Sequence, residues 1–77
     1  MPKFFFHVRG HGDYEIDSEG VDLPDRRAAE REAVAAAKDM VVDAIVGAGI
    51  IDQREIEVVS AEGELILVVP LQSVINI

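Results

Sequence analysis

The residues near the start of the chain that could bind a metal ion are His7, His11 and Asp13. A spacing of four residues aligns two imidazoles on one face of a helix, as in zinc-dependent proteases. Here the two histidines are separated by an aromatic strand pattern and a glycine turn, where no such alignment arises, and Arg9 between them would repel a cation. The pattern favours His7 as a half-exposed strand residue and His11 as a turn residue. A histidine-based metal-binding protein remains an alternative, and we predict no cofactor.

Catalytic groups are equally sparse. Nucleophilic catalysis needs serine, threonine or cysteine beside an oriented base. The chain has no cysteine and no threonine, and its serines are Ser18, Ser60 and Ser73. A dyad of Ser60 with His7 would require the two residues to meet across neighbouring strands, and no motif supports it. We therefore expect a protein that is not an enzyme.

The charge of the chain narrows the choice of partners. There are 15 Asp and Glu against 7 Lys and Arg, a net charge of −8. Such a surface repels phosphate groups, so we expect no nucleic acid and no anionic membrane as a partner, whereas a basic protein fits the charge. The Gly10-x-Gly12 pair precedes acidic residues and opens no helix, so it does not predict a phosphate site.

Neither a membrane span nor a signal peptide is predicted. A span needs roughly 18–20 consecutive apolar residues, and no segment approaches that length. The three phenylalanines near the start are followed at once by charged residues and by no small-residue cleavage pattern. A cytoplasmic location is therefore expected.

Two strands are predicted ahead of a long helix. Aromatic and β-branched residues dominate residues 3–9, and residues 14–17 could pair back as a short second strand. In the first strand, alternation directs Phe4 and Phe6 to one face and Phe5 and His7 to the other. No third strand is expected before the helix.

The helix is predicted within residues 21–48, with Asp25 as its N-cap and Gly47 and Gly49 at its end. Its predicted apolar arc consists of Ala33, Val34, Ala37, Met40, Val41, Ala44, Ile45 and Ala48. Four further apolar residues are predicted on the polar side, namely Ala28, Ala35, Val42 and Val46. The many alanines on the arc indicate that the helix packs closely on a sheet.

After the helix, strands are predicted at residues 54–60 and 64–69, joined by a turn at 61–63. Ile56 and Val58 of the first strand would face the core. The second strand is apolar on both faces, with Leu65, Leu67 and Val69 predicted on one side and Ile66 and Val68 on the other. The tail, residues 70–77, would fold over the open sheet face or dock into a second copy of the chain.

Several short motifs occur in a characteristic order: Pro2, the run Phe5-Phe6-His7, the turn Gly12-Asp13, and "DSEGVDLPD" before the alanine-rich helix. Together they resemble a family of small bacterial proteins that has no assigned function. The resemblance covers the chain to about Val69. It implies a strand–strand–helix–strand–strand domain and brings no catalytic residues.

A weaker likeness is to HicB-type antitoxins, which also place acidic, glycine-marked strands and "DLP" before an alanine-rich helix. That likeness implies an alternative function, the neutralisation of a small basic protein. The chain departs from the pattern because it lacks a third strand ahead of the helix and an appended DNA-binding segment.

The predicted fold is α+β, one domain over residues 1–77 with a small antiparallel sheet in ββαββ order and one long helix on one face. A core of this size contributes only about 3–5 kcal/mol, and no disulfide can reinforce it, so self-association is expected, most simply as a homodimer. The predicted interface residues are Phe5, His7, Ile66, Val68, Leu71, Val74 and Ile75. The function favoured by the sequence is that of a non-enzymatic acidic interaction module.

Overall fold

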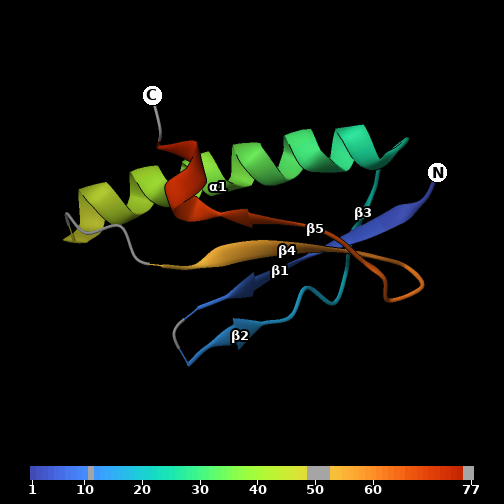
Figure 1. Cartoon of the computed structure of the whole chain (residues 1–77), viewed down its shortest axis with the longest axis horizontal. Helices are drawn as coiled ribbons and strands as arrows, with labels where there is room; N and C mark the ends of the chain where they lie inside the picture. The colour runs from blue at the N-terminus through green and yellow to red at the C-terminus, as the bar shows by residue number, and fades with distance from the viewer. Residues whose placement is uncertain (11, 49–52, 76–77) are drawn as a thin grey trace.

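The computed structural model of the chain describes residues 1–10, 12–48 and 53–75. It is an α+β domain of two layers, a sheet with one long helix across one face (Figure 1). The elements are β1 (Lys3–Arg9), β2 (Tyr14–Glu15), β3 (Val21–Asp22), α1 (Arg26–Ala48), β4 (Glu55–Ser60), β5 (Leu65–Pro70) and the short 3₁₀ helix η1 (Leu71–Val74). The predicted fold class and the ββαββ order are confirmed.

The sheet is antiparallel, with strand order β2-β1-β4-β5. A third strand before the helix, which the sequence analysis did not expect, is present as β3. It pairs with the start of β1, on the same edge of β1 that β2 pairs with at its end. The backbone N–H of Leu23 continues this pairing by donating to the carbonyl oxygen of Pro2 at 3.0 Å.

Helix α1 begins where the sequence predicted. The carboxylate of Asp25 accepts a hydrogen bond from the backbone N–H of Ala28 at 2.8 Å, as an N-cap does. Ala29, Ala33 and Ala37 form a row four residues apart along the helix and are completely buried. Because alanine adds only a methyl group, this row lets the helix backbone lie close to the sheet. None of the described helices combines the length and apolar character needed to cross a membrane.

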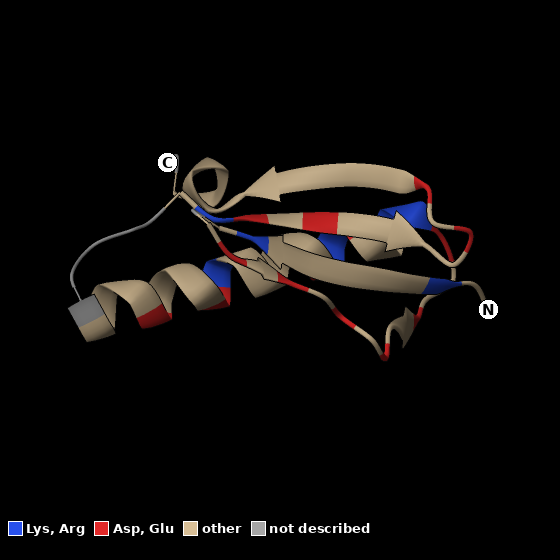
Figure 2. Ribbon diagram, turned by 90° about the horizontal axis from the view of Figure 1, so that it is seen from below, with Lys and Arg blue, Asp and Glu red and all other residues tan. Residues whose placement is uncertain are grey.

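The helix differs from its prediction at both ends. Ala28 was assigned to the polar side but is buried, because the buried row begins one turn earlier than expected. Ile45 was assigned to the apolar arc but is 49% exposed, since the last turns of α1 extend past the end of the sheet (Figures 1 and 2). Gly47 lies within the helix rather than ending it, and Gly49 lies outside the described residues.

Strand β5 contains a β-bulge that the sequence did not reveal. Val58 of β4 pairs with Leu67, but the next residue, Val59, pairs with Leu65, so Ile66 is the extra residue. A bulge inverts the alternation of side chains. Ile66, Leu67 and Val69 therefore all pack against the core on the helix side, where Ile56 and Val58 are also buried as predicted.

Candidate interaction site on the open sheet face

The face of the sheet opposite α1, here called the open face, is built from rows of residues that cross the strands. The rows are Phe5, Val59 and Leu65; His7, Glu57 and Val68; and Arg9 with Glu55, next to Tyr14 of β2. The apolar side chains at the β5 end of these rows are uncovered: Leu65 is 54% exposed and Val68 39%. The open face thus combines aromatic, charged and apolar groups.

The structure places three of the predicted interface residues on the open face, namely Phe5, His7 and Val68. The assignment of Ile66 to this face is wrong, because the bulge turns its side chain towards the core. Leu65 takes its place and was missed. An unbroken apolar run carries no signal for the position of a bulge, so the error could not be detected from the pattern of the strand.

The three predicted tail residues lie on the other side of the sheet. Leu71 is completely buried, and Val74 and Ile75 pack against the core beside α1. The backbone N–H of Leu71 donates to the carbonyl oxygen of Arg54 at 3.0 Å and so extends the β4–β5 pairing by one residue, after which η1 packs against α1. One of the two predictions for the tail, that it folds over the open face, is therefore wrong for its described part.

His7 is held in place by the segment that connects β2 to β3. Its Nδ1 atom accepts a hydrogen bond from the backbone N–H of Asp17 at 3.0 Å. An imidazole that accepts at Nδ1 and is neutral carries its proton on Nε2. The ring stacks near Phe5, with centroids 6.4 Å apart, and meets the ring of Tyr14 edge-on at 5.7 Å.

Asp17 acts as a clasp between this connecting segment and β1. Its carboxylate accepts hydrogen bonds from the backbone N–H groups of Phe6, Glu19 and Gly20, each at 3.1 Å. Burial raises the pKa of Asp17, but these three hydrogen bonds to the ionised form outweigh burial and hold its pKa below the ordinary value. The carboxylate is therefore committed to the backbone.

Gly20 donates one of the three hydrogen bonds to Asp17, and its position in the turn requires glycine. Its φ of +74° lies in the left-handed region, where a side chain is strained. A Cβ atom at this position would also lie 2.8 Å from Cγ of Lys3 and 3.0 Å from Cε2 of Phe5. The "EG" of the sequence motif is thus explained by the close approach of this turn to β1.

Glu57 is the second carboxylate of the open face whose oxygens both accept hydrogen bonds from the chain itself. Arg9 Nε donates to one oxygen at 2.6 Å, and the Tyr14 hydroxyl donates to the other at 2.9 Å. The hydrogen bond from Arg9 lowers the pKa of Glu57, against the opposing effect of burial, and the bond to the carboxylate raises the pKa of Tyr14. The Arg9 guanidinium also lies 4.0 Å from the centre of the Tyr14 ring, a cation–π contact.

The described residues do not form the serine–histidine dyad considered from the sequence, and the metal site considered there includes one residue that the structure does not describe. Among the described residues, no group of three or more histidine, aspartate and glutamate side chains could hold a metal ion. His11 lies outside the described residues. Ser60 pairs with Phe4 rather than His7, and its hydroxyl oxygen accepts the N–H of Glu64 at 3.1 Å, so Ser60 and His7 do not form a pair.

Negative charge is concentrated on the strands and the segments that connect them rather than on the helix. Residues 1–24 and 53–75 contain nine Asp and Glu against three Lys and Arg, a net of −6. Residues 25–48 contain five against four, a net of −1. Viewed onto the open face in Figure 2, acidic residues follow the segment from β2 to β3, β4 and the β4–β5 turn.

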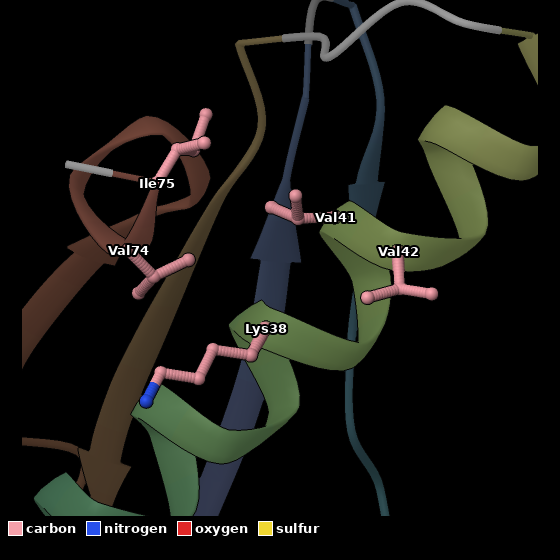
Figure 3. Close-up of a pocket in the computed structure, with 5 residues that line it drawn as sticks. All are labelled: Lys38, Val41, Val42, Val74 and Ile75. Carbon is pink, nitrogen blue, oxygen red and sulfur yellow. The ribbon is translucent and has the colours of Figure 1, made fainter. Parts of the chain in front are cut away.

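A separate apolar pocket of about 290 Å³ lies between α1 and the tail. Figure 3 shows Lys38, Val41 and Val42 on the helix and Val74 and Ile75 on the tail around the same space. This pocket is on the helix side of the sheet, so it is not part of the open face.

A comparison with known protein families identifies the family of the chain. A family model described as "Domain of unknown function (DUF6894)" matches residues 3–72, which include every described strand, α1 and the first half of η1. The predicted resemblance to a small family without an assigned function is thereby confirmed. No curated protein and no solved structure matches the chain.

Proposed function

The chain belongs to the DUF6894 family, whose function is unknown, and we propose that it is a non-enzymatic interaction module whose open face binds a positively charged protein segment. The observation that carries this proposal is the concentration of negative charge on the sheet around exposed apolar side chains. Residues 1–24 and 53–75, which form the sheet and its connecting segments, have a net charge of −6, against −1 for residues 25–48, which form the helix.

The composition of the open face supports binding rather than catalysis. Protein interfaces typically place apolar contacts at the centre and charged groups at the rim. Leu65 and Val68 provide exposed apolar groups here, and Phe5 extends the apolar area across the sheet. The carboxylates of Asp17 and Glu57 are engaged with hydrogen-bond donors of the chain itself, which favours a pre-organised surface over a reactive centre.

The chemistry of the partner follows from the same groups. Lysine and arginine side chains have apolar stems that pack on apolar surface and charged ends that reach acidic residues. A segment in which basic and apolar residues alternate would therefore match the open face in both respects. A negative field also speeds the encounter with a cationic partner at low salt.

The test compares two double variants with the same change in net charge. Asp22→Lys/Glu55→Lys alters the open face, where these residues pair with Lys3 and Arg9. The control, Glu30→Lys/Glu32→Lys, alters exposed positions of α1. Each substitution replaces a negative charge with a positive one and so raises the net charge by two, which gives both double variants a net charge of −4 instead of −8.

Binding is measured by fluorescence anisotropy with a labelled peptide in which lysine and valine alternate, and with a matched peptide of glutamate and valine. We expect the lysine peptide alone to bind, with affinity reduced about fivefold or more by the open-face variant and within about twofold by the helix control. Equal effects of the two variants would show attraction to net charge only. That result, or no binding of the lysine peptide, contradicts the proposal; circular dichroism verifies that both variants are folded.

A further inference from the structure

The two edges of the sheet are built differently. One edge consists of β2 and β3, two residues each, which flank the clasp of Asp17 and carry acidic neighbours such as Glu15, Glu19 and Asp22. Short strands and charged residues are common devices that prevent a sheet edge from pairing with another chain. This edge of the domain is therefore protected.

The other edge is β5, and it lacks that protection. Among the described residues, β5 pairs only with β4, and Figure 2 shows it along one margin of the sheet. Its outer side presents backbone N–H and C=O groups that can pair with a further strand. No charged residue occurs from Leu65 onwards, although 22 of the 77 residues of the chain are charged. The only proline of β5 is Pro70, at the last position of the strand.

We propose that β5 pairs antiparallel with β5 of a second copy, so that one sheet continues through a homodimer. This inference does not rest on the proposed function. Antiparallel pairing of a strand with its own copy closes a two-fold dimer, and no further copy can add at that edge. Two copies of β5 can also pair without repulsion between like charges, because β5 has no charged residue.

The register that fits the side chains is centred on Val68. Val68 then lies opposite Val68 of the second copy, and Leu67 lies opposite Val69, so that core-facing and open-face residues stay on their own sides. Stacking two copies by their open faces would instead bring together two surfaces with a negative charge, since residues 1–24 and 53–75 of each copy have a net charge of −6, which opposes that alternative.

The pairing has a consequence for the open face. Val68 of both copies meets at the centre of the combined sheet, and Leu65 of each copy lies to one side of it, so exposed apolar side chains follow the join between the two copies. The acidic segments from β2 to β3 lie at the two outer ends, because β2 and β3 occupy the opposite edge of each sheet. A binding surface on the dimer would therefore include residues of both copies.

A cysteine introduced at Val68 tests the register directly, because the chain has no cysteine of its own. Directly opposite residues of antiparallel strands have Cα atoms about 4.5–5.5 Å apart, within the range that a disulfide spans. Under mild oxidation we expect Val68→Cys to form a covalent species of twice the 8.4 kDa chain mass. The matched control is Val46→Cys on α1, where the residue is 81% exposed and remote from β5, and it should remain largely uncrosslinked.

A charge at the same position tests the contribution of the strand to association. In the wild-type protein, native mass spectrometry over a concentration series should show the dimer. Val68→Lys places two like charges opposite each other and should raise the dimer dissociation constant about tenfold or more, whereas Val46→Lys should change it by less than about twofold. A wild-type monomer at all concentrations, or a dimer that is weakened by Val46→Lys and not by Val68→Lys, overturns the inference.

Discussion

The two faces of the sheet are ordered by different interactions. Apolar side chains alone fill the covered face, and no polar or charged side chain among the described residues is buried there. On the open face, Asp17 and Glu57 accept directed hydrogen bonds from the backbone, from Arg9 and from Tyr14. Apolar packing is non-directional and scales with buried area, whereas each hydrogen bond fixes one orientation. The covered face therefore supplies most of the stability, and the open face supplies a defined surface.

The largest effect is expected from a cavity on the covered face. Ile56 is 1% exposed and lies at the centre of the core. Replacing it with alanine should lower the free energy of unfolding by about 2–5 kcal/mol, because the loss of buried apolar contacts adds to the cavity left behind. Urea denaturation measures this loss. The matched change on the open face, Val68→Ala, should lower it by less than about 1 kcal/mol; equal losses would contradict the contrast between the faces.

An intermediate effect is expected at the clasp. Asp17→Ala leaves three backbone N–H groups without their carboxylate partner and should lower the free energy of unfolding by about 1–3 kcal/mol. Hydrogen exchange should show faster opening of the segment between β2 and β3 than of β4. Asp13→Ala removes the same charge from an exposed turn and is the control. An Asp17 variant as stable as this control would show that the clasp does not hold the segment.

The smallest effect is spectroscopic. Tyr14 is the only tyrosine of the chain, so its ionisation can be followed by ultraviolet absorbance. Donation of its hydroxyl proton to the Glu57 carboxylate favours the protonated phenol, so the midpoint should lie above the ordinary pKa of 10.0. In Glu57→Gln, the amide is a weaker acceptor and carries no negative charge, so the midpoint should move down towards that value. An unchanged midpoint would show that this hydrogen bond does not form in solution.

The sequence predicted those parts of the fold that depend on regular periodicity or on a local cap. The alternation of Phe4 and Phe5 in β1 and the N-cap at Asp25 both follow from contacts within a few residues. It could not predict the position of Ile66, because a bulge in an all-apolar strand depends on how β4 aligns with it. It also missed β3, since a two-residue strand has too few residues to show alternation.

The candidate site was predictable only in its composition. The alternation within β1 placed His7 on the open face, but its partner Asp17 became evident only once the segment after β2 was seen to fold back. Likewise, the pairing of Arg9 with Glu57 joins residues 48 positions apart in the sequence. No local pattern encodes such a distant contact, and the same holds for Leu71, whose burial depends on the turn after Pro70 towards α1.

The central position of β1 also determines when the domain can fold during its synthesis. β1 is made first, yet its longest partner is β4, and Phe5 pairs with Val59. At typical translation rates, the ribosome needs about 3–10 s to add the residues between them. Until then β1 can pair only with the two-residue strands β2 and β3, and Phe4 and Phe6 lack the neighbouring strand β4. The sheet therefore assembles only after β4 has been synthesised, and a nascent chain stopped before β4 exposes three consecutive phenylalanines to chaperones.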